Sequence, residues 1–249
     1  MQLVAQGFSQ AIGIDYNDMF TPTVQLETLQ AIFHLTVTYG WSCGQDDIVT
    51  AFLHGDLDET KYMHQPEGYD DSTGHVARLL CSIYGLKQAT HIWNKLMHQK
   101  LITVRYDQLT SDTAVYPCNC NDDITILVIY VDNVMSFGNT KPGLSKSRAE
   151  LHKPFEMKEE DPNWVMGFKP KQQPMVAASS TKAEYMSVSH TAHQRLWLRH
   201  LLIELGFTHL RSDPTIIYLN NCSAMELVKE SHHHNQTKHI DIQHHFIRK

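Results

Sequence analysis

The stretch IYVDNVM, residues 129–135, places one carboxylate and one amide between two apolar arms. The arms are ITILVI, residues 124–129, and VMSF, residues 134–137. Two short apolar runs on either side of a polar pair predict two β-strands joined by a tight turn. A carboxylate at the tip of an apolar hairpin is an unusual arrangement unless it holds a cation. Asp132 and Asn133 are therefore the first candidate site residues.

The composition is typical of a globular protein, with 42% hydrophobic and 19% charged residues in a chain of 249. No apolar run approaches the ~20 residues that a membrane-spanning helix needs. The first ten residues show neither the basic region nor the apolar region of a signal peptide. The five cysteines are odd in number and scattered, which favours a reducing compartment. We therefore expect an intracellular protein, cytoplasmic or nuclear, without a membrane partner.

Charge and cysteine spacing give weaker indications. The net charge of −6 weighs against a nucleic-acid partner, because such proteins usually carry a basic surplus. A local basic groove would still be compatible with this balance. Cys118 and Cys120 form a single C-x-C pair, which is weak evidence for a metal site beside the usual zinc spacings.

Hydrophobic periodicity predicts a mixture of helices and strands in the first part of the chain. Apolar residues recur every three or four positions over residues 26–40, and Gly40 provides a C-terminal stop, so a helix is expected there. The other elements expected in this part are a strand at 43–49, a loop at 54–75 with a short strand near Tyr62 and Met63, a strand at 75–80, a helix within 86–101, the hairpin around Asp132, and a polar connection at 139–147.

The character of the sequence changes after about residue 150, and a polar joint lies near residues 167–182. A long helix over 182–206, a strand at 215–219, a short helix at 223–230 and a polar, His-rich tail are expected beyond it. Because helices and strands are mixed in both parts, the predicted fold class is α+β, followed by a partial α/β unit.

Seven segments of the first part resemble, in order, the reverse transcriptase of copia-type LTR retrotransposons. They are LVAQGFSQ (3–10), GIDYNDMFTPTVQLET (13–28), DIVTAFLHGDLDE (47–59), YMHQPEGY (62–69), SIYGLKQA (82–89), YVDN (130–133) and FEMK (155–158). Four later segments resemble the ribonuclease H that follows in the same polyprotein. They are QQPMVAASSTKAEYMSVS (172–189), LWLRHLLIELGF (196–207), IYLNNCSA (217–224) and TKHIDIQHHFIRK (237–249).

The resemblance implies a reverse-transcriptase fingers and palm at residues 1–167, with the thumb largely missing, and a truncated ribonuclease H-like unit at 168–249. The family's reaction is RNA-directed DNA synthesis from deoxynucleotides on an RNA or DNA template-primer. It uses two Mg²⁺ ions, or Mn²⁺ in their place, about 3.5–4 Å apart. The matching metal and catalytic residues here are Asp47 and Asp132. Taken alone, each would be an ordinary carboxylate at a strand end or turn.

The same resemblance assigns four residues to the incoming nucleotide. Phe52 matches the aromatic residue that blocks the 2′-hydroxyl of a ribonucleotide, although its spacing also suits a core aromatic. Gly85, Lys87 and Gln88 fall in the segment that lines the nucleotide pocket. The alternative for this segment is a solvent-facing start of a helix.

Departures from the family pattern bear on activity. Asn133 stands where the family has a second Asp at the hairpin tip, so the site carries two carboxylates instead of three and its affinity for Mg²⁺ should fall. Other departures, most of which remove positive charge, are at Gln2, Gln25, Val49, Leu80, Cys81, Thr90 and His91. They predict weak binding to the template.

The ribonuclease H remnant has fewer of the family's four carboxylates. Glu184 and Asp241 match two of them, while Asn220 stands where a third is expected, and the strand that carries the fourth is missing. An alternative role for the tail is zinc binding by His232, His233 and His234 with His239 or His244, although adjacent histidines give poor tetrahedral geometry.

Two hypotheses follow. The first is a reverse transcriptase by descent, with impaired or absent polymerase activity and with ribonuclease H activity lost. The alternative is a non-catalytic remnant of a retrotransposon that keeps some contact with nucleic acid. The sequence leaves the oligomeric state open.

Overall fold

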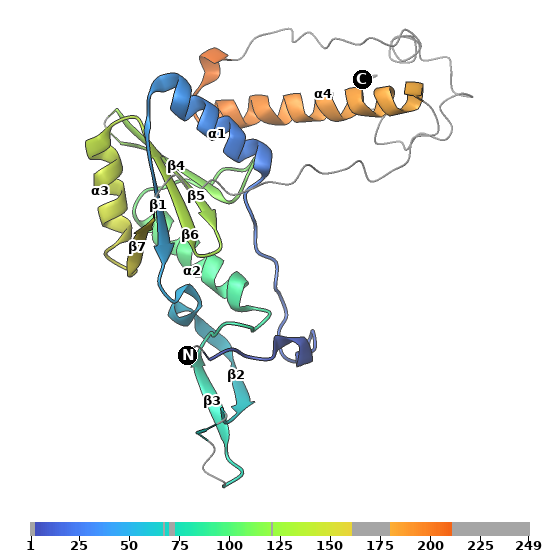
Figure 1. The fold of residues 1–249 in the computed structure, drawn as a ribbon, viewed down its shortest axis with the longest axis vertical. Coiled ribbons are helices and arrows are strands. Elements are labelled where there is room, and N and C mark those ends of the chain that lie inside the picture. The colour runs from blue at the N-terminus through green and yellow to red at the C-terminus, as the bar shows by residue number, and fades with distance from the viewer. Residues whose placement is uncertain (1–2, 67, 70–72, 121, 161–179, 211–249) are drawn as a thin grey trace. The chain divides into compact units, whose positions relative to one another are not determined.

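A computed structural model describes residues 3–66, 68–69, 73–120, 122–160 and 180–210 (Figure 1). Internal contacts divide the chain into two units, Met1–Met166 and Gly167–Lys249, which we treat separately. No helix within the described ranges has the length and apolar character needed to cross a membrane.

The centre of the first unit is a five-stranded sheet in the order β4-β5-β6-β1-β7 (Figure 1). Each neighbouring pair of strands in this sheet is antiparallel. The strands are β1 (Ser42–Ile48), β4 (Val115–Cys120), β5 (Asp123–Tyr130), β6 (Asn133–Gly138) and β7 (Met157–Glu160). The strand predicted at 43–49 and the two arms around Asp132 are therefore neighbours in one sheet.

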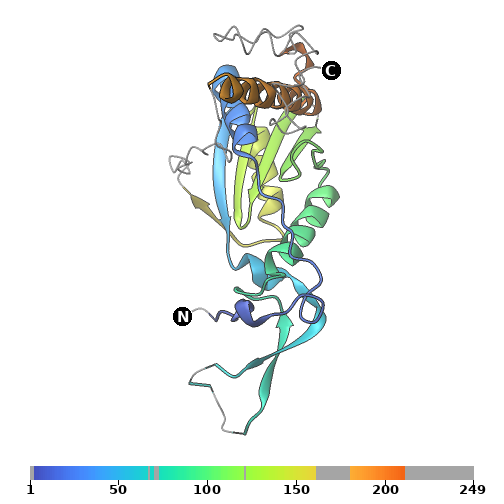
Figure 2. The ribbon, with the colours of Figure 1, turned by 90° about the vertical axis from the view of Figure 1, so that its right-hand side faces the viewer.

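The sheet has two differently covered faces, because successive side chains of a strand alternate between them. Ile48 of β1 joins the main core cluster with Trp93 and Met97 of α2 (Ala89–Thr103) and Leu151 of α3 (Lys141–Leu151). The opposite face meets α1 (Leu26–Tyr39), since the rings of Phe33 and Phe137 pack edge to face with their centroids 5.3 Å apart. Figure 2 shows these layers from the side.

The helix α1 has the extent that the sequence predicts, and both of its ends are explained locally. Gly40 follows its last residue in the left-handed conformation, with φ of 64°, and its N–H returns to the carbonyls of Thr36 and Val37. At the other end the Asp112 carboxylate accepts hydrogen bonds from the Gln25 N–H and the Thr28 hydroxyl, at 2.9 and 2.5 Å. The Asp112 carboxylate thus anchors the start of α1.

The loop predicted at 54–75 is wrong over residues 56–64, where the short strand predicted near Tyr62 and Met63 is part of a longer one. Residues Asp56–His64 form the nine-residue strand β2, which pairs antiparallel with β3 (Val76–Cys81) in a separate ribbon. Neither face of this ribbon is fully buried. Because backbone pairing rather than burial supports it, its sequence stays polar and lacks the apolar alternation by which strands are predicted.

The polar connection predicted at 139–147 is also wrong, because α3 begins there. The Thr140 side chain caps it by accepting a hydrogen bond from the Gly143 N–H at 3.1 Å, and Pro142 lies in its first turn. Leu144, Ser147 and Leu151 form its buried face. The high content of Pro, Gly and Ser concealed this helix. The strands β4 and β7 were not predicted either.

In the second unit, the helix α4 (Ser180–Glu204) lies where the sequence predicts one, and a 3-10 turn follows at Thr208–Leu210. The joint near 167–182 lies mostly outside the described residues, as do the predicted strand 215–219, the helix 223–230 and the His-rich tail in full. The remaining short elements belong to the first unit: 3-10 turns at Gly7–Ser9 and Ala51–His54.

Candidate functional site

The turn between β5 and β6 carries the first candidate carboxylate. Tyr130 pairs with Asn133, so Val131 and Asp132 form a two-residue turn. Val131 has a φ of 60°, a left-handed conformation that is costly for a β-branched residue. The buried indole of Trp93 donates a hydrogen bond to the Val131 carbonyl at 2.6 Å. The turn is therefore held in a strained shape by a side chain of α2.

The second candidate carboxylate comes from the end of β1. Asp47 lies opposite Asn133 of β6 on one side and opposite Lys158 of β7 on the other. The Ile48 N–H donates to the Asp132 carbonyl at 2.9 Å, which joins the end of β1 to the turn. Asp47 and Asp132 are thus brought to the same end of the sheet although 85 positions separate them in the sequence.

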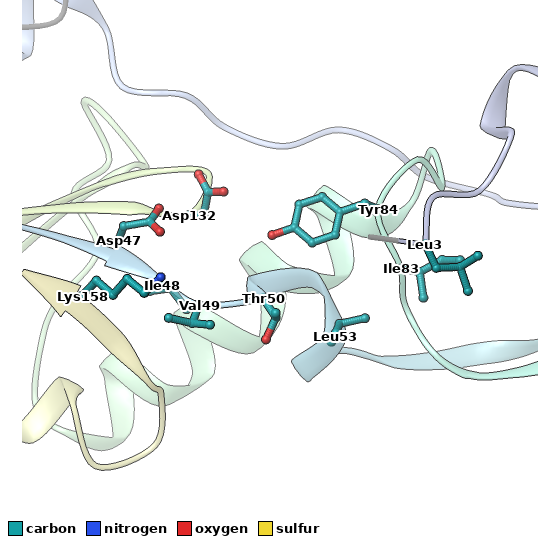
Figure 3. A pocket seen from close by; sticks show the side chains of 10 residues that line it. All are labelled: Leu3, Asp47, Ile48, Val49, Thr50, Leu53, Ile83, Tyr84, Asp132 and Lys158. Atoms are coloured by element: carbon teal, nitrogen blue, oxygen red, sulfur yellow. The ribbon is translucent and has the colours of Figure 1, made fainter. Parts of the chain in front are cut away.

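Both carboxylates open into one pocket of about 640 Å³. Figure 3 shows Asp47 and Asp132 beside each other at one end of it, with the Tyr84 hydroxyl pointing toward them. Its lining residues are Leu3, Asp47, Ile48, Val49, Thr50, Leu53, Ile83, Tyr84, Asp132 and Lys158.

The amide of Asn133 is engaged in a chain of hydrogen bonds. Its Nδ2 donates to the Asp132 carboxylate at 3.3 Å, and its Oδ1 accepts from the Gln45 amide at 3.3 Å. A carboxylate can only accept, so the nitrogen of Asn133 must face Asp132 and the oxygen must face Gln45. The Asn133 oxygen is thereby directed to a protein donor. Gln45, which the sequence did not single out, supports this orientation from β1.

Asp46, one residue before Asp47, faces the opposite side of the sheet. Its fully buried carboxylate accepts two hydrogen bonds from the Arg148 guanidinium of α3, at 2.8 and 2.6 Å. Arg148 also contacts Glu159 of β7 at 3.1 Å, and His152 lies 3.4 Å from Asp46. The hydrogen bonds that Arg148 donates to the Asp46 carboxylate raise the pKa of Arg148. This cluster fixes β1, β7 and α3 directly behind the candidate site.

Tyr84 is the titratable group most clearly affected by the two carboxylates. Partial burial raises its pKa, and the negative charges of Asp132 and Asp47 raise it further. A phenol near two carboxylates stays protonated because its ionisation would add a third negative charge. The motif YGLKQA contains Tyr84, so the sequence offered a signal for it, and the same holds for Lys158 in FEMK.

The four predicted nucleotide residues do not line the pocket described above. Phe52 is only 8% exposed and packs against the Tyr84 ring, with centroids 4.6 Å apart. The Lys87 ammonium donates to the Gln10 carbonyl at 3.0 Å, and Gln88 is hydrogen-bonded to the Gln10 side chain at 3.1 Å. Gly85 has a φ of 92°. Their role in nucleotide binding stays a prediction.

The remaining predicted residues fall in the second unit or outside the described residues. Glu184 falls within α4, while Asn220, Asp241 and the histidines at 232–234, 239 and 244 lie outside the described residues. Cys118 and Cys120 have their sulfur atoms 2.9 Å apart, and burial raises the pKa of the Cys118 thiol to about 12. Both thiols are free cysteines, and burial keeps the Cys118 thiol protonated at neutral pH. Within the described ranges, no three His, Cys, Asp or Glu side chains converge on a common metal position.

Comparison with known proteins identifies the class. A family model described as "Reverse transcriptase (RNA-dependent DNA polymerase)" matches residues 1–176. This chain belongs to that family.

The relatives then place it among transposon proteins. Over 172 residues, 68% of this chain, it is 36% identical to a retrovirus-related Pol polyprotein from transposon TNT 1-94 of Nicotiana tabacum. Over 176 residues, 70% of this chain, it is 33% identical to the corresponding polyprotein from transposon RE2 of Arabidopsis thaliana. These segments are 13% and 12% of the two polyproteins, so the chain spans about an eighth of their length. The resemblance to a fragment of a copia-type retrotransposon Pol polyprotein is confirmed.

Proposed function

We propose that the first unit is the palm and fingers of an RNA-directed DNA polymerase by descent, and that its polymerase activity is impaired or absent. The observation that carries this proposal is that Asp47 and Asp132, on neighbouring segments of one sheet, line the same pocket. Reverse transcriptases as a class act on a nucleic-acid template-primer and use divalent metal ions, which is why the carboxylate pair matters. The proposed boundary between the two functional units lies between residues 167 and 168.

The donor set at this pocket suits a hard divalent cation such as Mg²⁺ or Mn²⁺, for which carboxylate oxygens are the preferred protein ligands. Asp47 and Asp132 are the residues proposed to hold it. When bound, such a cation would neutralise charge on a nucleotide's phosphates and lower the barrier to nucleotidyl transfer. The reaction normally needs two cations, and Asn133 contributes no charge toward a second one. We therefore attribute the impaired activity chiefly to position 133.

For the second unit we propose a ribonuclease H remnant in residues 168–249, with Glu184 and Asp241 as inherited carboxylates and Asn220 as a lost one. Four carboxylates converge in a competent site of this family, and here two remain. We expect no cleavage of an RNA–DNA hybrid. The proposed location of the protein is intracellular.

Primer extension on an RNA template tests the polymerase proposal. With Mg²⁺ we expect products no longer than a few added nucleotides, and with Mn²⁺ any residual extension should increase, because Mn²⁺ tolerates a poorer ligand set. Asp132→Asn is the matched control and should abolish whatever extension the wild-type chain gives. Processive synthesis by the wild-type chain would contradict the proposal.

A second candidate function, a non-catalytic remnant that only contacts nucleic acid, is favoured by the hydrogen bonds of the Asn133 amide to Asp132 and Gln45. They stabilise the turn without a cation. The variant Asn133→Asp separates the two candidates. If it restores extension, the rest of the polymerase site is intact and the remnant hypothesis fails. If primer extension stays absent although template binding is measurable, the result supports the hypothesis of a non-catalytic remnant.

A further inference from the structure

Tyr84 is the residue of the YGLKQA segment that faces the candidate metal site. The neighbouring polar residues of this segment are already engaged, since Lys87 donates to the Gln10 carbonyl and the buried Gln88 amide contacts Gln10 and the Asp15 carbonyl. Tyr84, in contrast, lines the pocket together with both carboxylates. Its hydroxyl points toward them in Figure 3.

The backbone around Tyr84 is held firmly. The Ala5 N–H donates to the Tyr84 carbonyl at 2.7 Å, which fastens the N-terminal segment to this turn. Gly85 follows in the left-handed region, with φ of 92°, and a Cβ at position 85 would collide with the Ala5 carbonyl oxygen. Only glycine fits there without strain. The chain thus turns sharply after Tyr84 and leaves its side chain directed into the pocket.

The ring of Tyr84 is positioned by Phe52. The two rings pack edge to face, with centroids 4.6 Å apart and an interplanar angle of 61°. Phe52 is buried in the main core cluster, which gives the Tyr84 ring a fixed support. Aromatic pairs of this geometry stabilise one another beyond simple burial. The hydroxyl end of Tyr84 is therefore presented at a defined place in the pocket.

We propose that the Tyr84 hydroxyl donates a hydrogen bond to a phosphate oxygen of a nucleoside triphosphate whose divalent cation is held by Asp47 and Asp132. This inference rests on the proposed function of the pocket. The charged groups around the hydroxyl are Asp47, Asp132 and Lys158. Carboxylates cannot donate, so Tyr84, Thr50 and the exposed Lys158 are the side-chain donors among the residues that line this pocket. Of the two hydroxyls, that of Tyr84 points toward the carboxylates (Figure 3).

The protonation state suits a donor. Because burial and the two carboxylates raise the pKa of Tyr84, the phenol carries its proton throughout the neutral pH range. The hydroxyl can therefore donate its proton in a hydrogen bond to an oxygen in the pocket.

Isothermal titration calorimetry with Mn²⁺ alone, and then with dCTP in the presence of saturating Mn²⁺, tests this role without requiring polymerase activity. We expect Tyr84→Phe to bind Mn²⁺ like the wild-type chain and to bind the Mn²⁺ complex of dCTP about tenfold more weakly, the effect of one hydrogen bond to a charged group. Tyr62→Phe, which changes an exposed tyrosine of the β2–β3 ribbon, is the matched control and should leave both affinities unchanged.

The outcomes separate this inference from the proposed function. Equal dCTP affinity in the wild-type chain and in Tyr84→Phe overturns the role of Tyr84 and leaves the metal site standing. Binding of Mn²⁺ without any binding of dCTP also overturns the role of Tyr84 and leaves the metal site standing. If the wild-type chain binds no Mn²⁺, the proposed function fails and the role of Tyr84 fails with it.

Discussion

Replacement of Arg148 by Met should lower the free energy of unfolding by about 3–5 kcal/mol, because it leaves the Asp46 carboxylate buried without its cation. Asp46 is fully buried, and its carboxylate accepts two hydrogen bonds from the Arg148 guanidinium. It also lies opposite Glu159 in the β1–β7 pairing, so the variant leaves two carboxylates side by side on one face of the sheet. Urea denaturation followed by circular dichroism measures the change.

Two further variants show whether the loss comes from the buried charge. Lys153→Met removes an exposed cation just beyond the same helix and should change stability by less than about 0.5 kcal/mol. The double variant Asp46→Leu/Arg148→Met removes both charges and should recover most of the loss, since apolar replacements of a buried pair are often neutral. A loss below about 1 kcal/mol for Arg148→Met alone would contradict a structural role of this cluster.

Trp93→Ala should lower the free energy of unfolding by about 3–5 kcal/mol, the range found when a large buried aromatic is truncated. Trp93 is 1% exposed and packs edge to face on Phe155, with centroids 5.1 Å apart. Its indole also provides the hydrogen bond to the Val131 carbonyl of the strained turn. Circular dichroism is again the suitable signal, because removal of a tryptophan alters the fluorescence of both states.

Trp93→Phe keeps an aromatic ring and removes the indole N–H. It therefore tests the hydrogen bond from the indole to the Val131 carbonyl separately from the packing of the ring. We expect this variant to be destabilised less than Trp93→Ala and still to show faster hydrogen exchange in the turn at Val131 and Asp132. Lys95→Ala, an exposed residue of the same helix, is the control and should leave the turn unchanged. Unaltered exchange at the turn in Trp93→Phe would show that the indole does not restrain it.

The sequence predicted the parts of the fold in which burial leaves a periodic pattern. The helix α1 was found because its apolar spacing ends at Gly40, and the arms of the hairpin because they are continuous apolar runs. The strand β2 was missed because its side chains never become fully buried. The helix α3 escapes prediction because its start is polar and contains Thr140 and Pro142, residue types that also favour loops but that here cap and start a helix.

The sequence predicts those site residues that lie in the family's motifs. It does not predict the residues that other parts of the fold bring next to them. The motifs predict Asp47 and Asp132, and both residues line one pocket. The contacts of Gln45 and Arg148 depend on strand register and on helix packing, and a single sequence contains neither. Tyr84 stood within a quoted motif, yet only its position beside the carboxylates distinguishes it from Gln88.

The most direct test of whether Asp47 and Asp132 hold a cation is a Mn²⁺ titration, followed by electron paramagnetic resonance, of the wild-type chain and of Asp47→Asn and Asp132→Asn. Each variant removes one of the two carboxylates, and we expect each to weaken Mn²⁺ binding by about tenfold or more. Asp58→Asn, at an exposed carboxylate of β2, should bind like the wild-type chain. Equal Mn²⁺ affinity in all four chains would contradict a cation site between Asp47 and Asp132.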